Sequence, residues 1–303
     1  MKRTFLILSL FVCTTLHAEQ CLVIGDSLSK EYELEFPALY PRNRAAWDSR
    51  NWAELLHENR KAWFDLGKWS GFADPRLVGH EHNWAFPGAT TSKIKSELSS
   101  WRSVWWTREL QGQIRSAAER VVIFAGGNDV DSYYPAIYKG AASAKYINAT
   151  RDNLRFIVDY VRKVKGTIPI VLVSVPHVGC TPDIQKAHPT DPVKTQRVTA
   201  ALDSLNAQLA LFAKQRGIAF VPGVYELTKS LITQPLRIGE MTFISQADAD
   251  SRPEYLFSGD GFHPNTCAHA KIAQMIIEAF RTRYPASNIT PLGDAEILQT
   301  VLK

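Results

Sequence analysis

Side chains that could do chemistry together stand at a few separate places in the sequence. A Gly-Asp-Ser-Leu turn presents Ser27, and near the C-terminus Asp260 stands three residues before His263. Between them, Gly88 and Asn128 offer amide N–H groups. A serine hydroxyl with a histidine and a carboxylate can perform nucleophilic catalysis, and amide donors can hold the oxyanion that such an attack creates.

Each of these segments, taken alone, has a plainer structural interpretation. A Gly-Asp-Ser turn is common, and Gly126-Gly-Asn-Asp129 is typical of a turn because glycine and asparagine tolerate positive φ. An Asp-x-x-His segment is typical of a capped helix start. The chemistry therefore depends on whether the fold brings the segments together.

The hydrophobic pattern predicts alternating strands and helices. Short apolar runs that end in glycine or proline indicate buried parallel strands over 21–24, 82–86, 121–125, 168–175 and 218–222. Apolar residues at helical spacing predict helices over 146–165, 193–216 and 268–284. Such alternation favours βαβ crossovers and a three-layer α/β/α sandwich.

The candidate residues follow the ends of predicted strands. Ser27, Gly88 and Asn128 each lie two or three residues after the end of one of the apolar runs. Ligands of open parallel sheets bind beyond the carboxyl ends of the strands. We therefore expect these three residues to lie at one edge of the sheet.

In this order and placement the segments resemble the SGNH, or GDSL, hydrolase family of esterases and lipases. The resemblance runs from Cys21 to about Tyr284 and includes all four family blocks, which are Gly25-Asp-Ser-Leu28, Gly88, Gly126-Gly-Asn-Asp129 and Asp260-Gly-Phe-His263. It implies a flavodoxin-like α/β/α sandwich of about five parallel strands. It also implies a carboxylic ester hydrolase that needs no metal or cofactor.

The resemblance assigns a role to each matching residue. Ser27 would be the nucleophile, His263 its general base, and Asp260 the residue that orients His263. The backbone amides of Ser27 and Gly88 and the side-chain amide of Asn128 would form the oxyanion hole. These types suit the reaction, since a serine hydroxyl needs a base near neutral pH and an aspartate fixes the imidazole tautomer.

The tryptophans are unevenly distributed, and they bear on the substrate. All eight lie between Trp47 and Trp106, partly in an expected insertion over 29–81. Flat indoles suit the faces of sugar rings, so Trp63, Trp69 and Trp84 are candidate substrate-binding residues. The alternative is that these rings pack in the core. Helix-face packing is expected instead for Trp101, Trp105 and Trp106, together with Leu98 and Leu110.

We expect a serine esterase that acts on a small-molecule or polysaccharide ester, with a carbohydrate O-acetylesterase as the leading interpretation. A lipase or acyl thioesterase with longer chains is the first alternative. A non-catalytic carbohydrate-binding protein on the same fold is the second, and it would require a damaged set of catalytic residues.

The N-terminus and the overall charge indicate where the protein acts. Lys2 and Arg3 precede an apolar run over 4–16, which is typical of a cleaved signal peptide over 1–18 and is too short to span a bilayer. A buried strand or a membrane anchor is the alternative. We expect one domain over 19–303, secreted or periplasmic, without a stable membrane anchor. A formal net charge of +5 gives no reason to expect nucleic acid as the partner.

Export would place Cys21, Cys180 and Cys267 in an oxidising compartment. At most one intrachain disulfide can form, and Cys180 with Cys267 is the favoured pair, with three unpaired thiols as the alternative.

Two segments resemble metal ligands without completing a site. His80 and His82 would share one strand face without a third ligand, and Asp248-Ala-Asp250 has spacing too loose for an EF-hand. No metal is expected at either.

Overall fold

Four apolar segments pair as a parallel β-sheet in the computed structural model, which describes residues 18–32, 50–71, 78–100, 104–249, 252 and 254–301. The strand order is β1-β4-β5-β6. The bounds are β1 Cys21–Gly25, β4 Arg120–Phe124, β5 Ile170–Val173 and β6 Ala219–Val221. These strands confirm four of the predicted runs, while the expected signal segment lies almost wholly outside the described residues.

The fifth predicted strand, over 82–86, is only partly formed. It runs beside β1, where Val23 N–H donates to His82 and Trp84 N–H donates to Val23, but it makes a single parallel bridge. The Asn83 side chain accepts a hydrogen bond from the Ala85 amide, which curls the segment away from a regular strand. Counting this segment gives the spatial order 2-1-3-4-5 of a flavodoxin-like sheet, so the predicted fold class is confirmed.

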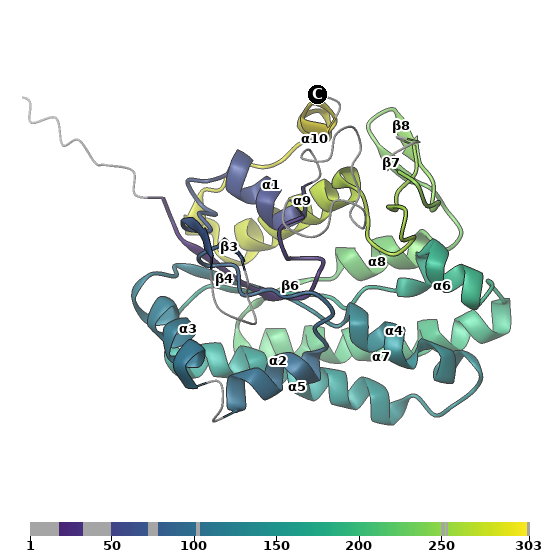
Figure 1. Ribbon diagram of the computed structural model, residues 1–303, viewed down its shortest axis with the longest axis horizontal. Helices are drawn as coiled ribbons and strands as arrows, with labels where there is room; N and C mark the ends of the chain where they lie inside the picture. The colour runs from purple at the N-terminus through teal and green to yellow at the C-terminus, as the bar shows by residue number, and fades with distance from the viewer. Residues whose placement is uncertain are drawn as a thin grey trace, which may run out of the picture.

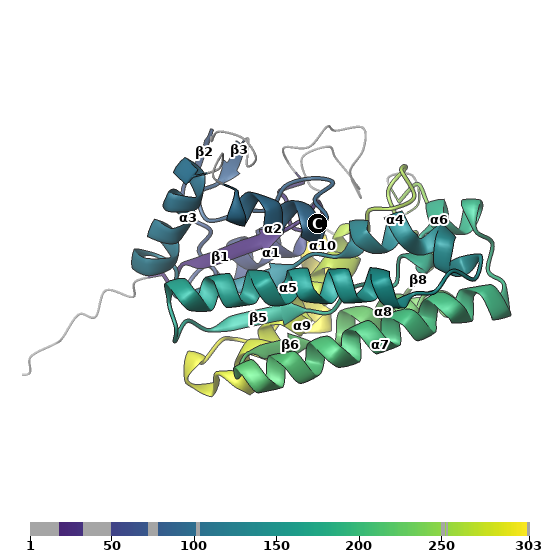
Figure 2. The same cartoon turned by 90° about the horizontal axis from the view of Figure 1, so that it is seen from below.

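Helices cover both faces of the sheet (Figures 1 and 2). Alternate strand residues such as Ile123 and Phe124 point into two separate apolar clusters. One face is covered by α2 Thr91–Ser99, α3 Val104–Ser116, α4 Gly127–Tyr138, α5 Ala144–Val164 and α7 Pro192–Arg216. The other face is covered by α1 Trp52–Asn59, α8 Gly223–Ser230 and α9 Thr266–Arg283. The three predicted helices correspond to α5, α7 and α9.

The described residues also form several shorter elements. Two antiparallel hairpins are formed by β2 Trp69–Gly71 with β3 Val78–His80 and by β7 Leu236–Ile238 with β8 Met241–Phe243. Further helices in the described segments are η2 Val178–Cys180, α6 Pro182–Ala187, η3 Pro285–Ser287 and α10 Asp294–Val301. None of the described helices is both long and apolar enough to cross a membrane.

The segment after α9 belongs to the core, although its sequence has no strong pattern. Ile289, Leu292 and Ile297 are buried in the same cluster as α1 and α9. Arg60 fastens this segment, because its guanidinium donates to the carbonyls of Thr290 and Pro291.

The favoured disulfide between Cys180 and Cys267 is wrong. Both residues, and Cys21 as well, are buried free thiols. All three lie in the single apolar cluster on the α1, α8 and α9 side of the sheet. Burial there accounts for them without a covalent link, since free cysteine packs as a small hydrophobic residue.

Candidate active site

A chain of short hydrogen bonds joins three side chains at the carboxyl edge of the sheet. His263 Nε2 lies 2.8 Å from Ser27 Oγ, and His263 Nδ1 lies 2.6 Å from a carboxylate oxygen of Asp260. Ser27 follows β1, whereas Asp260 and His263 precede α9, whose N-terminus is capped by the side chain of Asn265. The fold thus brings together residues that are 236 positions apart in the sequence.

The Asp260 carboxylate is held firmly by its own segment. Its Oδ1 accepts hydrogen bonds from the Ser258 hydroxyl at 2.5 Å and from the backbone amides of Phe262 and His263. Burial alone would raise the pKa of Asp260, but these bonds and the one to the His263 ring outweigh it and hold the pKa below its usual value. Asp260 is therefore ionised at neutral pH, as a residue that orients an imidazole must be.

The turn that carries Ser27 explains its motif. A Cβ atom on Gly25 would lie 2.6 Å from the Phe124 carbonyl oxygen, so only glycine fits between β1 and β4. Asp26 closes the turn, because its Oδ1 accepts from the Leu28 amide and its carbonyl accepts from the Ser29 amide.

Two sets of contacts bring the predicted amide donors to the same edge. Phe86 N–H donates to Gly25, which places the Gly88 turn near that of Ser27. The Asn128 side-chain amide donates to the Ala89 carbonyl at 3.1 Å. Within the described part of the chain, no group accepts a hydrogen bond from the backbone amides of Ser27 or Gly88. Both amides are therefore available to an anionic oxygen.

Asp129 forms a second link between these segments, which no local sequence pattern indicates. Asp129 accepts hydrogen bonds from the backbone amide and the hydroxyl of Thr91, at 2.7 Å and 2.6 Å. Burial raises the pKa of Asp129, although the Thr91 donors oppose that effect. The link ties the start of α2 to the start of α4, and so fixes the Gly88 turn relative to Asn128.

Two of the three tryptophans predicted to bind substrate do not lie where a substrate at Ser27 could reach them. Trp84 is a core residue, because it is only 4% exposed and its indole N–H donates to Gln113 at 2.8 Å. Trp63 belongs to a segment that pairs with residues 19–21 at the amino end of β1, away from Ser27. The burial of Trp84 and the partial burial of Trp63 at the opposite end of β1 correct these two expectations.

Trp69 is the exposed member of the three. It is 43% exposed on the β2–β3 hairpin and packs edge-on against His80 at 5.0 Å. The His80 amide donates to Glu31, four residues after Ser27, so the hairpin is attached to the nucleophile loop. Trp69 remains a candidate for substrate contact.

Packing of a tryptophan helix face near α3 is only partly observed. Leu98 and Leu110 are buried, but Trp105 is 53% exposed and is not packed as expected. Trp101 lies outside the described residues, as does the side chain of Trp106.

No group of three or more His, Cys, Asp or Glu side chains in the described segments is arranged to hold a metal ion. His82 is buried, and the His80 ring packs against that of His57 at 4.3 Å. Asp250 is not among the described residues.

Comparisons with known proteins give a family and several structural likenesses. The chain resembles a lipase/acylhydrolase from Enterococcus faecalis with 14% identity over 90% of this chain and 98% of that chain, at a TM-score of 0.43. It resembles the lipase Lip_vut3 from a goat rumen metagenome with 14% identity over 90% of this chain and 98% of that chain, at a TM-score of 0.48. It resembles phospholipase A1 from Streptomyces albidoflavus NA297 with 15% identity over 87% of this chain and 100% of that chain, at a TM-score of 0.47.

A search of curated proteins gives no match. The assignment rests on the family comparison, in which residues 23–271 match the GDSL-like lipase/acylhydrolase family. This range contains all of the residues of the edge described above. The chain is therefore a carboxylic ester hydrolase and belongs to the GDSL-like lipase/acylhydrolase family.

Proposed function

We propose that the protein hydrolyses carboxylic esters through an acyl-enzyme on Ser27. The single observation that carries this proposal is the unbroken hydrogen-bond chain from Ser27 through His263 to Asp260. His263 takes the Ser27 proton as the hydroxyl attacks the ester carbonyl, and it then protonates the departing alcohol. Asp260 stabilises the imidazolium that forms between these steps.

The oxyanion of the tetrahedral intermediate forms at the edge where free amides converge. The backbone amides of Ser27 and Gly88 and the side chain of Asn128 are the proposed donors. A water molecule, deprotonated by His263, then attacks the acyl-enzyme and regenerates Ser27. The cycle consumes one ester and one water and yields an acid and an alcohol, so it needs no cofactor.

Replacement of the nucleophile tests this mechanism. Ser27→Ala should lower the hydrolysis of p-nitrophenyl butyrate by at least about 10³-fold, because no acyl-enzyme can form. Ser116→Ala, on the outer face of α3, serves as the matched control and should keep full activity. Equal activity of the wild type and Ser27→Ala would overturn the mechanism.

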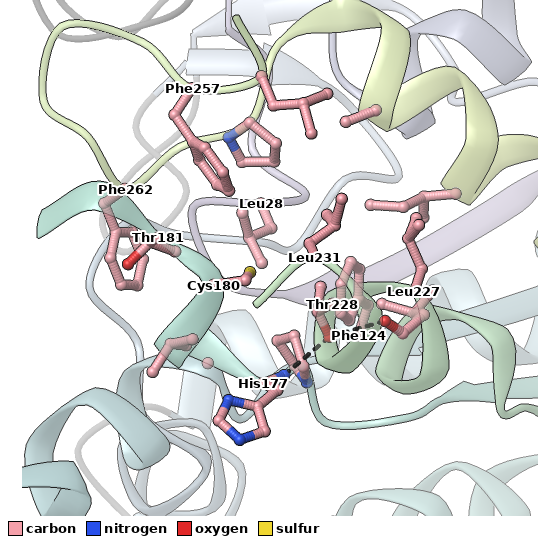
Figure 3. A pocket seen from close by; sticks show the side chains of 18 residues that line it. Leu28, Phe124, His177, Cys180, Thr181, Leu227, Thr228, Leu231, Phe257 and Phe262 are labelled. Carbon is pink, nitrogen blue, oxygen red and sulfur yellow. Dashed lines mark hydrogen bonds between the residues drawn. The ribbon is translucent and has the colours of Figure 1, made fainter. Parts of the chain in front are cut away.

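A cavity lies next to the hydrogen-bond chain of Ser27, His263 and Asp260, and it bears on which acyl group the enzyme accepts. Its lining includes Leu28 after Ser27, Gly127 before Asn128, and both neighbours of His263, Phe262 and Pro264 (Figure 3). The lining is almost entirely carbon, so the cavity suits an acyl chain better than a sugar. We propose that the acyl group enters it.

The size of the cavity limits the chain. It encloses about 60 Å³. On this measure one water-sized group needs about 10–15 Å³, so the cavity holds about four to six non-hydrogen atoms. With the carbonyl at Ser27 and outside the cavity, the alkyl part of a butyryl or hexanoyl group fits, whereas that of a palmitoyl group does not without rearrangement. The cavity therefore favours short apolar acyl groups over the long chains of a typical lipase.

A series of aryl esters from acetyl to palmitoyl tests the acyl assignment. We expect the highest kcat/KM at butyryl or hexanoyl. Ala268→Leu on α9 fills the cavity and should move the optimum to acetyl, whereas Ala279→Leu on the same helix lies outside it and should leave the profile unchanged. A rate that rises steadily to palmitoyl would contradict the proposal.

A carbohydrate alcohol is the second candidate, and the exposed indole of Trp69 is the observation that favours it. Trp69→Ala should lower kcat/KM on an acylated xylan or sugar by about tenfold, because a stacking face is lost. The same variant should hydrolyse the aryl ester at the wild-type rate. If Trp69→Ala matches the wild type on the carbohydrate ester as well as on the aryl ester, then Trp69 does not bind the substrate and the carbohydrate proposal fails.

A further inference from the structure

A buried tyrosine and a second histidine lie directly behind the catalytic histidine. Tyr32 Oη is 2.6 Å from His269 Nε2, although the two residues are 237 positions apart. Both side chains are buried, with His269 fully so. The Tyr32 ring packs edge-on against the rings of His269 and His263, with distances between ring centroids of 5.0 Å and 6.3 Å.

His269 is held neutral by its surroundings. Burial lowers the pKa of His269 to about 3, and the neighbouring His263 lowers it further. Among the described residues its Nδ1 atom has no hydrogen-bond partner, so the bond to Tyr32 is the polar contact that fixes the ring. A neutral His269 does not repel the His263 imidazolium that forms during the reaction.

Tyr32 is fixed from the opposite side by the start of α1. Its backbone amide donates to Glu54 at 3.0 Å, and the Asn51 amide donates to the same carboxylate oxygen at 2.8 Å. The Asn51 side-chain amide donates to the Lys30 carbonyl. The Tyr32–His269 bond therefore joins the nucleophile loop, braced by α1, to the helix that follows His263.

We propose that Tyr32 and His269 form a positioning pair that keeps His263 aligned between Ser27 and Asp260. This inference rests on the proposed esterase mechanism. The imidazole can turn about its Cα–Cβ and Cβ–Cγ bonds, and only one orientation satisfies both the 2.8 Å and the 2.6 Å contacts. Phe262 contacts the ring at 5.4 Å, and Tyr32 packs against it as a second aromatic neighbour, so the pair restricts that rotation.

Tyr32→Phe removes the hydroxyl and keeps the ring. It should lower kcat on p-nitrophenyl butyrate by about tenfold while KM stays within about twofold, because misalignment of a catalytic base slows chemistry without weakening binding. Labelling of Ser27 by a fluorophosphonate should slow by a similar factor. The matched control is Tyr284→Phe, which removes a hydroxyl bonded to Ile170 at the far end of β5 and should leave kcat unchanged.

A double variant separates positioning from stability. Tyr32→Phe leaves the His269 ring without its partner and should lower the unfolding midpoint, whereas Tyr32→Phe with His269→Leu removes both polar groups and should recover much of it. The proposal expects kcat to stay low in the double variant. Recovery of kcat together with stability, or wild-type kcat in Tyr32→Phe, would overturn it.

The controls also keep this inference separate from the mechanism. If the wild type and Tyr284→Phe hydrolyse the ester and Ser27→Ala does not, the mechanism holds whatever Tyr32→Phe shows. If Ser27→Ala remains active, the mechanism itself has failed, and with it the positioning role.

Discussion

Asp26, beside the proposed nucleophile, is a buried carboxyl group with an uneven environment. Its Oδ1 accepts from the Leu28 amide, while its Oδ2 has no hydrogen-bond partner among the described residues. Burial raises the pKa of Asp26 to about 7 from an ordinary value of 3.8, and the charge of Asp129 adds to the rise. The hydrogen bond from Leu28 opposes it.

Stability should therefore depend on pH through Asp26. Because the pKa is higher in the folded state, unfolding releases a proton between pH 3.8 and about 7, and the folded state loses stability as pH rises through that window. Asp26→Asn keeps an oxygen for Leu28 and cannot ionise. In urea unfolding, the free energy of unfolding of the variant minus that of the wild type should increase by up to about 4 kcal/mol from pH 4 to pH 8. A difference that is constant over this range would contradict the assignment.

Residue patterns in the sequence predicted some site residues and missed others for a physical reason. Asp260 and His263 stand three apart, and Ser27 sits in its own motif, so local spacing reveals them. Tyr32 and His269 meet only through the fold, and neither has a local signature. The predicted substrate-binding role of Trp84 is wrong, and its indole partner, Gln113, lies on a different element that local sequence does not reveal.

At the scale of elements, the start of α4 places Asn128. Gly126 caps this helix in the left-handed region, at φ 118°. A Cβ atom there would lie 2.9 Å from a methyl carbon of Val175 in the loop after β5. The helix therefore begins where it does only because residue 126 has no side chain.

Gly126→Ala should displace the start of α4 and with it the Asn128 amide. We expect a loss of about 1–3 kcal/mol in unfolding free energy and of about 10²-fold in kcat, since an oxyanion donor is moved. Gly140→Ala provides the matched control at the other end of α4. Its φ is also positive, at 103°, but its Cβ would meet only the flexible end of Arg197, at 3.4 Å. It should cost stability without changing kcat, and a similar kcat loss in both variants would contradict the local explanation.

The sequence pattern predicts which strands exist, but it does not predict how completely each one forms. The runs that form β1, β4, β5 and β6 are apolar on both faces, which is how strands between two helical layers must read. The 82–86 segment begins with two polar residues, and only Asn83 pairs with β1. The Ala85 amide donates to the Asn83 side chain, so the pairing stops there. The segment over 286–303 has no continuous apolar run that would indicate a buried element, although Ile289, Leu292 and Ile297 lie in the core.

At the scale of the whole molecule, the three described cysteines are buried in one apolar cluster as free thiols. Cys21, Cys180 and Cys267 come from three different elements, and all are buried. Burial raises the pKa of Cys180 and of Cys267 to about 12. Thiols of this kind react slowly, because the thiolate is the reactive form.

The same thiols report on processing of the N-terminus. We propose that the chain is exported and cut near Ala18, on the strength of Lys2, Arg3 and the apolar run that follows them. Cutting removes Cys13 and leaves three of the four cysteines. Protein recovered from an exporting host should therefore show three reactive thiols in denaturant and close to none when folded, with an unfolding midpoint that a reductant does not change.

Controls distinguish the outcomes. A chain expressed from residue 19 in the cytoplasm should give the same count of three, and its mass should exceed that of the exported protein only by the initiator methionine before Glu19. Four thiols, with a mass that includes residues 1–18, would contradict processing. One thiol without reductant and three with it would show that two of the buried cysteines are paired after all, and the midpoint would then fall when reductant is added, because the closed loop would no longer restrict the unfolded chain.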